Sequence, residues 1–424
     1  MMLQEHYLTS KVFVAGGQPS FTYVGREFVG AHQTLEDHVQ NYLDTGYKAL
    51  TVTGPSKSGK TVLCRRVIPK DKGLWIQGGE IRTEEDFWTQ VASSLNINIS
   101  ETHTQTDSHT VGGSFEISGQ GKLPLVFEAG GKASSNVAGA NQTSKTIVTA
   151  RNLRNSALKA LEASNIPLVV DDFHYISREV QKDIVRALKS PIFDGLRVVL
   201  IAVPHRAFDA VRSEREMTGR VDQLSINLWS RAELSAIVDQ GSPLLNVKFP
   251  SEIVNDFLDQ SQGSPHLMQE FCSKICIQNK IRETTDIEAI LSVKDRLSFF
   301  KEIAASTSKP AFDLLARGPR QRSDRKTRRF KDGTSGDIYL AVLHALSDCG
   351  ARSKMTYEDI RSSLRNILAE EMPQSHEIGR VLVNMSKIAR DKIEGEAVLE
   401  WDEEETVLHI ADPFFSFYLK WATQ

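Results

Sequence analysis

The chain has 424 residues, enough for roughly two to four domains with a sizeable apolar core. Its formal net charge is -3 and its pI is about 6.4, so no global positive field attracts nucleic acid, and any such binding needs a local patch. The sequence lacks a long apolar run and a signal-peptide pattern, so we expect a cytoplasmic protein without a membrane span.

The first candidate ligand contact lies in the segment at residues 21–27. A segment just upstream of a phosphate-binding loop often folds beside the base of a nucleotide, and such a loop begins at Gly54. We therefore expect Tyr23 and Val24 to contact adenine.

Residues 54–61 carry the phosphate-binding P-loop pattern G-x-x-x-x-G-K-T. An apolar strand is predicted before the loop at 48–53, and a helix is predicted after it. The glycines permit backbone angles that point successive N–H groups at phosphate oxygens. Lys60 is expected to reach the β- and γ-phosphates of ATP, and the Thr61 hydroxyl to ligate Mg²⁺. The predicted nucleotide contacts are Gly54, Pro55, Ser56, Lys57, Ser58, Gly59, Lys60, Thr61 and Val62.

A second strand is predicted at 74–77, and Thr83 and Asp86 form a capping-box pattern that opens a helix. Residues 97–147 then change character, because they are rich in Gly, Ser, Thr and Asn and poor in charge. Short apolar alternations predict one or two β-hairpins inserted in the domain. The insert is either a mobile surface loop or a hairpin that contacts a partner or another subunit.

The second half of the expected site is an apolar strand at 166–170 that ends in two carboxylates. Asp171 and Asp172 follow it directly. We expect Asp171 to hold Mg²⁺ through its waters, and Asp172 to orient and deprotonate the attacking water. Such a strand is weak evidence alone and strong evidence after a P-loop.

A helix at 177–189 and a buried strand at 198–203 come next, and His205 follows the strand. His205 either senses the γ-phosphate or lies on an exposed loop. Arg220 precedes an alternating strand predicted at 224–228. It is the best candidate for an arginine finger that a neighbouring subunit delivers in a homo-oligomer, and the alternative is an ordinary surface arginine.

Ser230 and Glu233 form another capping box, and the composition is helical from 230 to 315, as in a lid that closes over a nucleotide. Gly263-Ser264-Pro265 separates two of the helices. Cys272 and Cys276 are four residues apart and share a helix face with Met268, which favours core packing over metal or redox chemistry.

Residues 317–331 contain eight basic residues and one acid, within a segment at 316–336 that we predict to be a linker. The run is either a solvated linker or a contact with the phosphates of DNA.

Residues 337–424 are predicted to form a winged helix. Its third helix carries a polar face suited to reading a DNA groove: His376, Arg380, Asn384, Lys387 and Arg390. The hairpin tip at 402–405 is acidic and would be repelled by phosphate. The domain therefore either binds DNA without its wing or is a protein-contact or autoinhibitory module.

The P-loop, the strand that ends at Asp172, the strand at 198–203, Gly219-Arg220 and Gly263-Ser264-Pro265 together resemble the AAA+/STAND class of P-loop ATPases. The resemblance covers residues 20–424 outside the insert, and it is nearest to members with a C-terminal winged helix that are related to origin-recognition proteins. It implies an α/β fold with a P-loop parallel-sheet AAA+ core at 1–229, a helical lid at 230–315 and a C-terminal winged-helix domain.

Two departures from the family pattern favour slow hydrolysis. AAA+ enzymes usually have Glu where this chain has Asp172, and the lid arginine that senses phosphate is absent, with His266 near its place. The resemblance thus implies an ATP- and Mg²⁺-dependent switch that oligomerises and engages DNA or a partner protein. The alternative is a non-catalytic, ATP-gated signalling scaffold, as in bacterial antiphage defence.

Overall fold

The computed structural model describes residues 5–28, 33–97, 141–203, 219–320, 325–369, 371–393 and 397–422. The chain forms two compact units. We call Glu27–Thr53 with Thr61–Ser225 the sheet unit, and Met1–Arg26 with Gly54–Lys60 and Ile226–Gln424 the helical unit.

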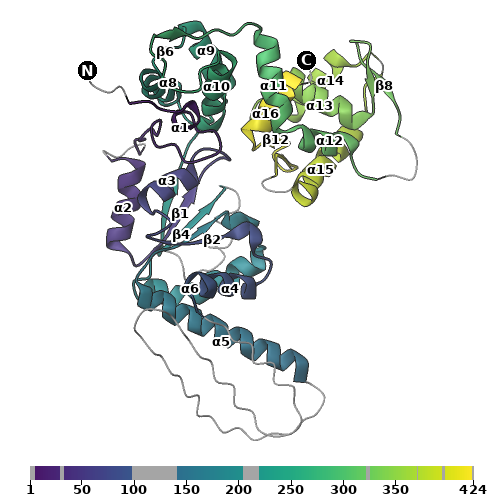
Figure 1. Ribbon diagram of the computed structural model, residues 1–424. Helices are drawn as coiled ribbons and strands as arrows, with labels where there is room; N and C mark the ends of the chain where they lie inside the picture. The colour runs from purple at the N-terminus through teal and green to yellow at the C-terminus, as the bar shows by residue number, and fades with distance from the viewer. Residues whose placement is uncertain are drawn as a thin grey trace, which may run out of the picture. The chain divides into compact units, whose positions relative to one another are not determined.

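The sheet unit is built on five parallel strands in the order β2-β3-β4-β1-β5 (Figure 1). The strands are β1 (Ala49–Thr53), β2 (Leu74–Gln77), β3 (Leu168–Asp171), β4 (Val198–Ala202) and β5 (Val221–Ser225). Every residue of β1, β3 and β4 is buried, as their apolar sequences predict. The prediction of an α/β fold around a parallel sheet is confirmed.

The helices of this unit are α2 (Leu35–Thr45), α3 (Lys60–Val67), α4 (Glu84–Ser94), α5 (Asn141–Ser164) and α6 (Arg178–Phe193), with short 3-10 turns at Gly78–Glu80 and Phe173–Tyr175 (Figure 1). Of these helices, α4, α5 and α6 pack on the sheet through one apolar cluster. The predicted capping box at Thr83 is present, because its side chain accepts the Asp86 N–H and the Asp86 carboxylate accepts the Thr83 N–H. Phe87 and Trp88 of α4 are buried in the cluster.

Two sequence predictions need correction in the sheet unit. Helix α5 already begins at Asn141, so the predicted hairpin insert does not extend to 147; its residues 98–140 lie outside the described part of the chain. Strand β5 covers Val221–Ser225 rather than 224–228. The alternation of Leu224, Ile226 and Leu228 resembled a strand, but the Arg26 side chain donates to the carbonyls of Asn227 and Leu228.

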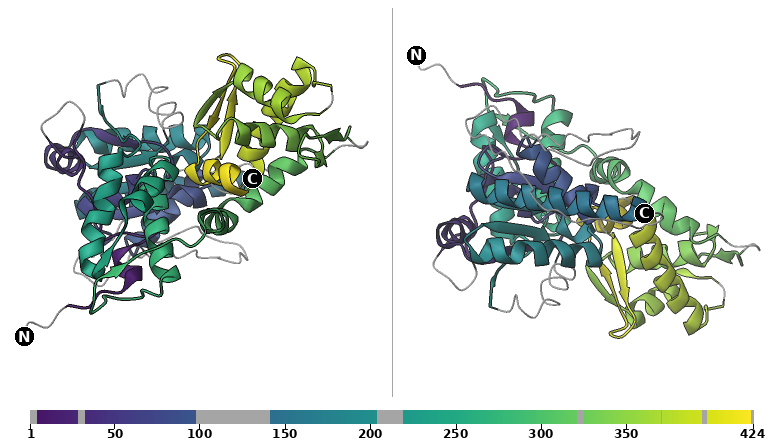
Figure 2. Two further views of the ribbon diagram at one scale, coloured as in Figure 1. Left: turned by 90° about the horizontal axis from the view of Figure 1, so that it is seen from above. Right: turned by 90° about the horizontal axis from the view of Figure 1, so that it is seen from below.

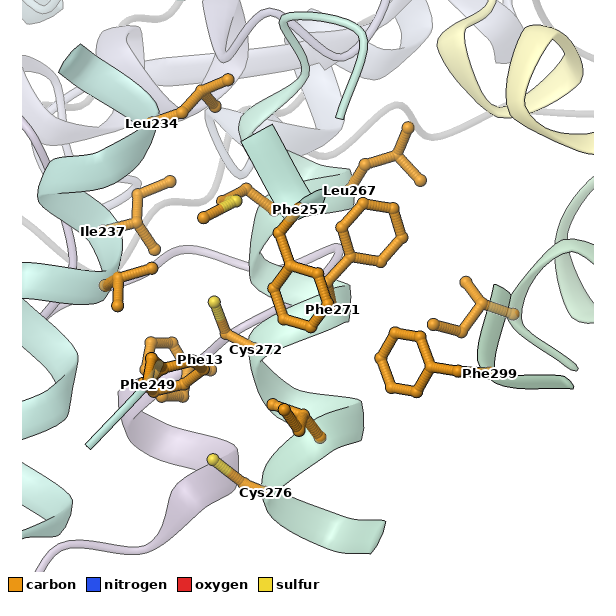
Figure 3. Packing of buried hydrophobic residues seen from close by; sticks show 14 of the residues in the cluster. Phe13, Leu234, Ile237, Phe249, Phe257, Leu267, Phe271, Cys272, Cys276 and Phe299 are labelled. Atoms are coloured by element: carbon orange, nitrogen blue, oxygen red, sulfur yellow. The ribbon is translucent and has the colours of Figure 1, made fainter. Parts of the chain in front are cut away.

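The first part of the helical unit is a bundle of helices with an aromatic core (Figure 3). Its elements are α1 (Thr9–Val12), α8 (Arg231–Leu245), α9 (Ser251–Gln260), α10 (Pro265–Gln278) and α11 (Arg296–Thr307), with a parallel pair of strands, β6 (Val247–Lys248) and β7 (Ala289–Ile290). The predicted capping box of Ser230 and Glu233 opens α8. Cys272 and Cys276 are fully buried in this core, as predicted.

The C-terminal part adds a second apolar cluster. Its elements are α12 (Lys309–Arg317), β8 (Arg328–Arg329), β9 (Ser335–Gly336), α13 (Ile338–Asp348), β10 (Lys354–Thr356), α14 (Tyr357–Ile367), α15 (Ser375–Lys392), β11 (Leu399–Asp402), β12 (Val407–Ile410) and α16 (Pro413–Ala422). Strands β10, β12 and β11 form an antiparallel sheet in that order.

Helix α16, at the yellow end of the chain in Figure 2, joins the two clusters of the helical unit. Phe415 and Leu419 are buried in the C-terminal cluster, whereas Phe417 and Trp421 are buried in the cluster of the helical bundle. The two parts of this unit therefore share one aromatic helix. No helix among the described residues is long and apolar enough to cross a bilayer.

Candidate phosphate-binding site

The sheet brings the two predicted magnesium ligands together at the edge where β1 and β3 end. The Thr61 hydroxyl donates a hydrogen bond of 3.0 Å to Oδ1 of Asp171. Asp171 is only 3% exposed, and its Oδ1 also accepts the Asp172 N–H at 3.1 Å. A hydroxyl and a carboxylate oxygen are hard donors of the kind that Mg²⁺ prefers. Thr61 and Asp171 thus fit a magnesium ion.

Protein atoms alone would leave such an ion incompletely coordinated. Among the described residues, no group of three or more His, Cys, Asp or Glu side chains could hold a metal. Magnesium in nucleotide sites usually takes one or two protein ligands and completes its shell with water and phosphate oxygens. The Thr61 hydroxyl and the Asp171 carboxylate would therefore fit a metal ion that takes its other ligands from water or phosphate.

Asp172 occupies a tight turn directly after β3. Its backbone is left-handed, with φ 54° and ψ 37°. A Cβ at Gly78, directly after β2, would lie 2.3 Å from the Asp172 carbonyl oxygen, so only glycine fits there. The turn fixes the Asp172 carboxylate at the same sheet edge as Asp171. Sequence reasoning missed Gly78, although a Gly-Gly pair directly after a predicted strand was a usable signal.

The P-loop geometry depends on its two glycines. A Cβ at Gly54 would lie 2.5 Å from the carbonyl oxygen of Ile226, and Gly59 has a φ of +95°. Lys60 is 9% exposed, and its Nζ donates to the carbonyls of Gly54 at 2.8 Å and Pro55 at 2.7 Å. A triphosphate in the loop would compete with these carbonyls for the ammonium group. Lys60 and Thr61 are consecutive residues at the start of α3.

Two further residues near the loop were missed by sequence reasoning. The Trp229 Nε1–H donates to the Ser58 carbonyl at 2.9 Å, and the Arg26 guanidinium lies 5.1 Å from the centre of the Trp229 ring. The predicted adenine contacts lie close to Arg26 in sequence: Val24 is 8% exposed within the core of the helical bundle, and Tyr23 is half-buried. Contact of these two residues with adenine stays a prediction.

Arg220 lies at the opposite end of the sheet from Asp171 and Asp172. It directly precedes β5, whose first residue, Val221, pairs with Ala49 at the start of β1. Its guanidinium lies 5.0 Å from the ring centre of Phe193, which is 61% exposed. A strand of five residues spans about 16 Å, so Arg220 and Asp171 lie about one strand length apart along the sheet. The role of Arg220 as an arginine finger stays a prediction. His205 lies outside the described residues.

Phe414 and His266 of the helical unit lie near Lys57 of the P-loop. Lys57 has a left-handed backbone with φ 58°, and its Nζ lies 5.3 Å from the ring centre of Phe414. The His266 ring packs edge-on against Phe414 with centroids 4.7 Å apart. Burial and the nearby Lys57 charge lower the pKa of His266 to about 4. His266 is therefore neutral at pH 7 and would not replace the positive charge of a lid arginine.

The buried His266 predicts acid sensitivity. In the unfolded chain His266 is protonated below its ordinary pKa of 6.5, whereas in the folded chain it is protonated only below about pH 4. The free energy of unfolding therefore decreases as the pH falls from 6.5 to 4. We expect His266→Phe, which keeps the ring contact with Phe414, to lose on the order of 2–3 kcal/mol less than wild type between pH 7 and pH 4. Urea unfolding at the two pH values measures this difference, and equal losses in both proteins would contradict the assignment.

An all-parallel sheet, a glycine loop that continues into a helix, and an acidic strand end beside the loop threonine define an α/β protein of the P-loop class. No protein-family model matches the sequence, and no curated protein matches it. Solved structures are similar at low identity. The Walker-type ATPase paby2304 of Pyrococcus abyssi is 12% identical, with 91% of this chain and 94% of that one covered and a TM-score of 0.49.

Two ORC proteins of Aeropyrum pernix are also similar. Its ORC2 protein in the ADP form is 14% identical, with 95% of this chain and 94% of that one covered and a TM-score of 0.48. Its ORC1 protein in complex with DNA is 9% identical, with 99% and 97% covered and a TM-score of 0.46.

Proposed function

We propose that the chain binds ATP with Mg²⁺ at residues 54–62 and hydrolyses it slowly, as an AAA+-type switch. The observation that carries this proposal is the hydrogen bond from Thr61 to Asp171, because it joins the P-loop helix to the acidic strand. In P-loop ATPases these two positions hold the magnesium ion. The left-handed turns at Gly59 and Lys57 further support a loop whose N–H groups face phosphate.

The roles of the remaining residues follow from their positions. Lys60 binds the β- and γ-phosphates once it leaves the carbonyls of its own loop. Bound Mg²⁺ would neutralise charge that develops on the transferring phosphoryl group. Asp172 orients the attacking water and accepts its proton. Its side chain is one methylene shorter than that of Glu, which supports slow turnover, and Arg220 of a neighbouring subunit completes the site.

The switch proposal is supported by contacts that run from the P-loop to helix α16. Lys57 lies over Phe414. Burial raises the pKa of Asp412, and the positive charge of Lys57 partly offsets this rise. Ser416 and Trp421 of the same helix donate to Gln262 at 3.4 Å and Gln260 at 3.2 Å, beside the turn between α9 and α10. A nucleotide that draws Lys57 towards its phosphates would therefore change how α16 is held.

The exposed basic face of α15 supports contact with DNA, and the acidic turn between β11 and β12 supports contact with a protein. His376, Arg380, Lys387 and Arg390 are exposed on this helix. Asn384, predicted to share their role, donates to the Tyr339 hydroxyl at 3.0 Å. The acidic residues at 402–405 form the turn between β11 and β12. We propose that this C-terminal region, as a winged helix, engages DNA or a partner protein.

Part of the basic run at 317–331 has a structural role. Arg325 pairs with Asp337 at 2.5 Å, and Arg328, which is 5% exposed, pairs with Glu377 at 3.4 Å. These two side chains are committed to the C-terminal fold. The exposed Arg317, Arg320 and Lys326 remain for a contact with phosphates.

Replacing Phe414 tests the link between α16 and the P-loop. Phe414→Leu keeps an apolar side chain but removes the ring face under Lys57. Since this contact competes with phosphate for the ammonium, we expect ATP affinity to rise about 2- to 5-fold. Isothermal titration calorimetry measures the change. The control is Phe417→Leu in the same helix, and an equal effect of both variants would contradict the link.

Two measurements test the proposed function as a whole. Titration with Mg·ATP should give saturable binding, and removal of Mg²⁺ should weaken it. Steady-state hydrolysis should be slow and should rise on addition of duplex DNA. Assembly without turnover would instead favour a non-catalytic signalling scaffold, and absence of nucleotide binding would overturn both proposals.

A further inference from the structure

The outer side of the P-loop is held by a tryptophan that no nucleotide-binding pattern includes. The carbonyls of a phosphate-binding loop point away from the ligand when its N–H groups face inward, and these carbonyls then need other donors. The Trp229 Nε1–H supplies one to Ser58 at a distance of 2.9 Å. The Trp229 ring also lies close to Gly59, because a Cβ at Gly59 would be 3.9 Å from its six-membered ring.

Trp229 is itself held in place by a buried arginine. Arg26 is 9% exposed and lies over the indole ring. Its Nε donates to Glu233 at 2.8 Å, and its Nη2 donates to the Asn227 carbonyl at 3.1 Å. Burial alone would raise the pKa of Glu233, but hydrogen bonds from Arg26 and Ser230 outweigh it and the pKa lies below its ordinary value. Glu233 therefore stays ionised and keeps Arg26 against the ring.

The same tryptophan is tied to the helical bundle through its backbone. Its N–H donates to the Gly263 carbonyl at 3.0 Å, in the turn between α9 and α10. A Cβ at Gly263 would lie 2.9 Å from the Cβ of Leu228, so the two segments approach closely. Ser230, the next residue, is the N-cap of α8. Trp229 thus connects the P-loop to the starts of α8 and α10.

We propose that Trp229 is a positioning residue of the nucleotide site, which shapes the P-loop and couples it to the helical bundle. This inference rests on the proposed function, since it concerns the same site. Trp229 does not touch the reacting atoms. Its hydrogen bond keeps the Ser58 carbonyl on the outer side of the P-loop, so the loop amides face the phosphate position before a ligand binds. Through the same residue, movement of α8 and α10 is transmitted to the loop.

The chain offers a matched control in the sheet unit. The Trp75 Nε1–H also donates to a backbone carbonyl, that of Ile68 at 3.2 Å, and Arg65 lies 5.3 Å from its ring centre. Trp75→Phe and Trp229→Phe therefore remove the same kind of hydrogen bond and keep the ring. Only the second change acts on the P-loop.

The test compares the affinity of the full-length variants for ADP, measured by calorimetry, with their thermal stability. We expect Trp229→Phe to bind ADP roughly 5- to 10-fold more weakly, as loss of one hydrogen bond predicts. Trp75→Phe should bind like wild type while losing a similar amount of thermal stability. ADP affinity within 2-fold of wild type in Trp229→Phe, or an equal loss in Trp75→Phe, would overturn the inference.

A spectroscopic readout separates positioning from a general structural effect. At saturating ADP, the tryptophan emission of wild type and Trp75→Phe should change, because the Trp229 indole senses the loop. Trp229→Phe should show little change, and a full change in this variant would overturn the coupling. If wild type binds neither ADP nor ATP, the proposed function itself fails and this inference fails with it.

Discussion

Lys60→Ala is expected to weaken ATP binding by at least about 100-fold. The variant removes the side chain that we propose to bind the β- and γ-phosphates, and charge-assisted hydrogen bonds to phosphate are among the strongest that a protein makes. Lys60 also donates hydrogen bonds to the Gly54 and Pro55 carbonyls. These two carbonyls lose that donor in the variant. Calorimetric titration with Mg·ATP measures the loss.

The control for Lys60→Ala is Lys72→Ala, which removes the same charge from an exposed position beyond α3. This control should bind ATP like wild type. Thermal unfolding of both variants checks that the fold is retained. Binding by Lys60→Ala within about 3-fold of wild type would contradict the proposed site.

Asp172→Asn is expected to leave ATP affinity within about 3-fold of wild type and to lower turnover by at least about 100-fold. The amide cannot accept the proton of the attacking water, which removes general-base catalysis. Asn also tolerates the left-handed backbone found at this position, so the turn after β3 should survive. Phosphate release at saturating ATP, together with calorimetric affinity, separates the two effects.

Two acidic residues serve as comparisons for Asp172→Asn. Asp183→Asn changes an exposed carboxylate on α6 and should have no effect on turnover. Asp171→Asn should weaken the Mg²⁺-dependent part of binding, because Asp171 accepts the Thr61 hydrogen bond. Turnover that is unchanged in Asp172→Asn would remove this residue from catalysis.

The features that sequence predicts well are local. The strands at 74–77 and 198–202 are short apolar runs bounded by turn residues, and the helix at 84–94 begins at a capping box that needs only Thr83 and Asp86. The P-loop is likewise one contiguous segment, and its glycines are needed for the backbone conformation of the loop. The burial of Cys272 and Cys276 followed from their spacing on a helix face.

The features that sequence misses depend on residues far apart in the chain. Arg26 is separated by about two hundred residues from the carbonyls and the carboxylate that it holds, so nothing near it in sequence announces its place beside the P-loop. The predicted end of β5 was wrong for the same reason, since Arg26 donates to the carbonyls of Asn227 and Leu228, which a longer strand would have used. In the sequence, Trp229 is an apolar residue before a capping box, and only the fold brings its indole N–H to the Ser58 carbonyl.

The position of Arg220 was outside the reach of sequence patterns as well. Its place beside a strand was predicted correctly, but the end of the sheet at which it lies depends on the parallel register of β5 with β1. Its role as an arginine finger from a neighbouring subunit stays a prediction. Whether α15 reads DNA likewise depends on a partner, and the pairing of Arg390 with Glu400 at 3.1 Å shows one of its basic residues held within the domain.

The central claim is that nucleotide at the P-loop controls assembly and partner binding. Mass in solution, measured with ADP or with a non-hydrolysable ATP analogue, each with and without duplex DNA, tests it most directly. We predict a larger species with the ATP analogue than with ADP, and a further gain in mass on addition of DNA. The same mass in all four conditions, at nucleotide concentrations that saturate the site, would contradict the claim.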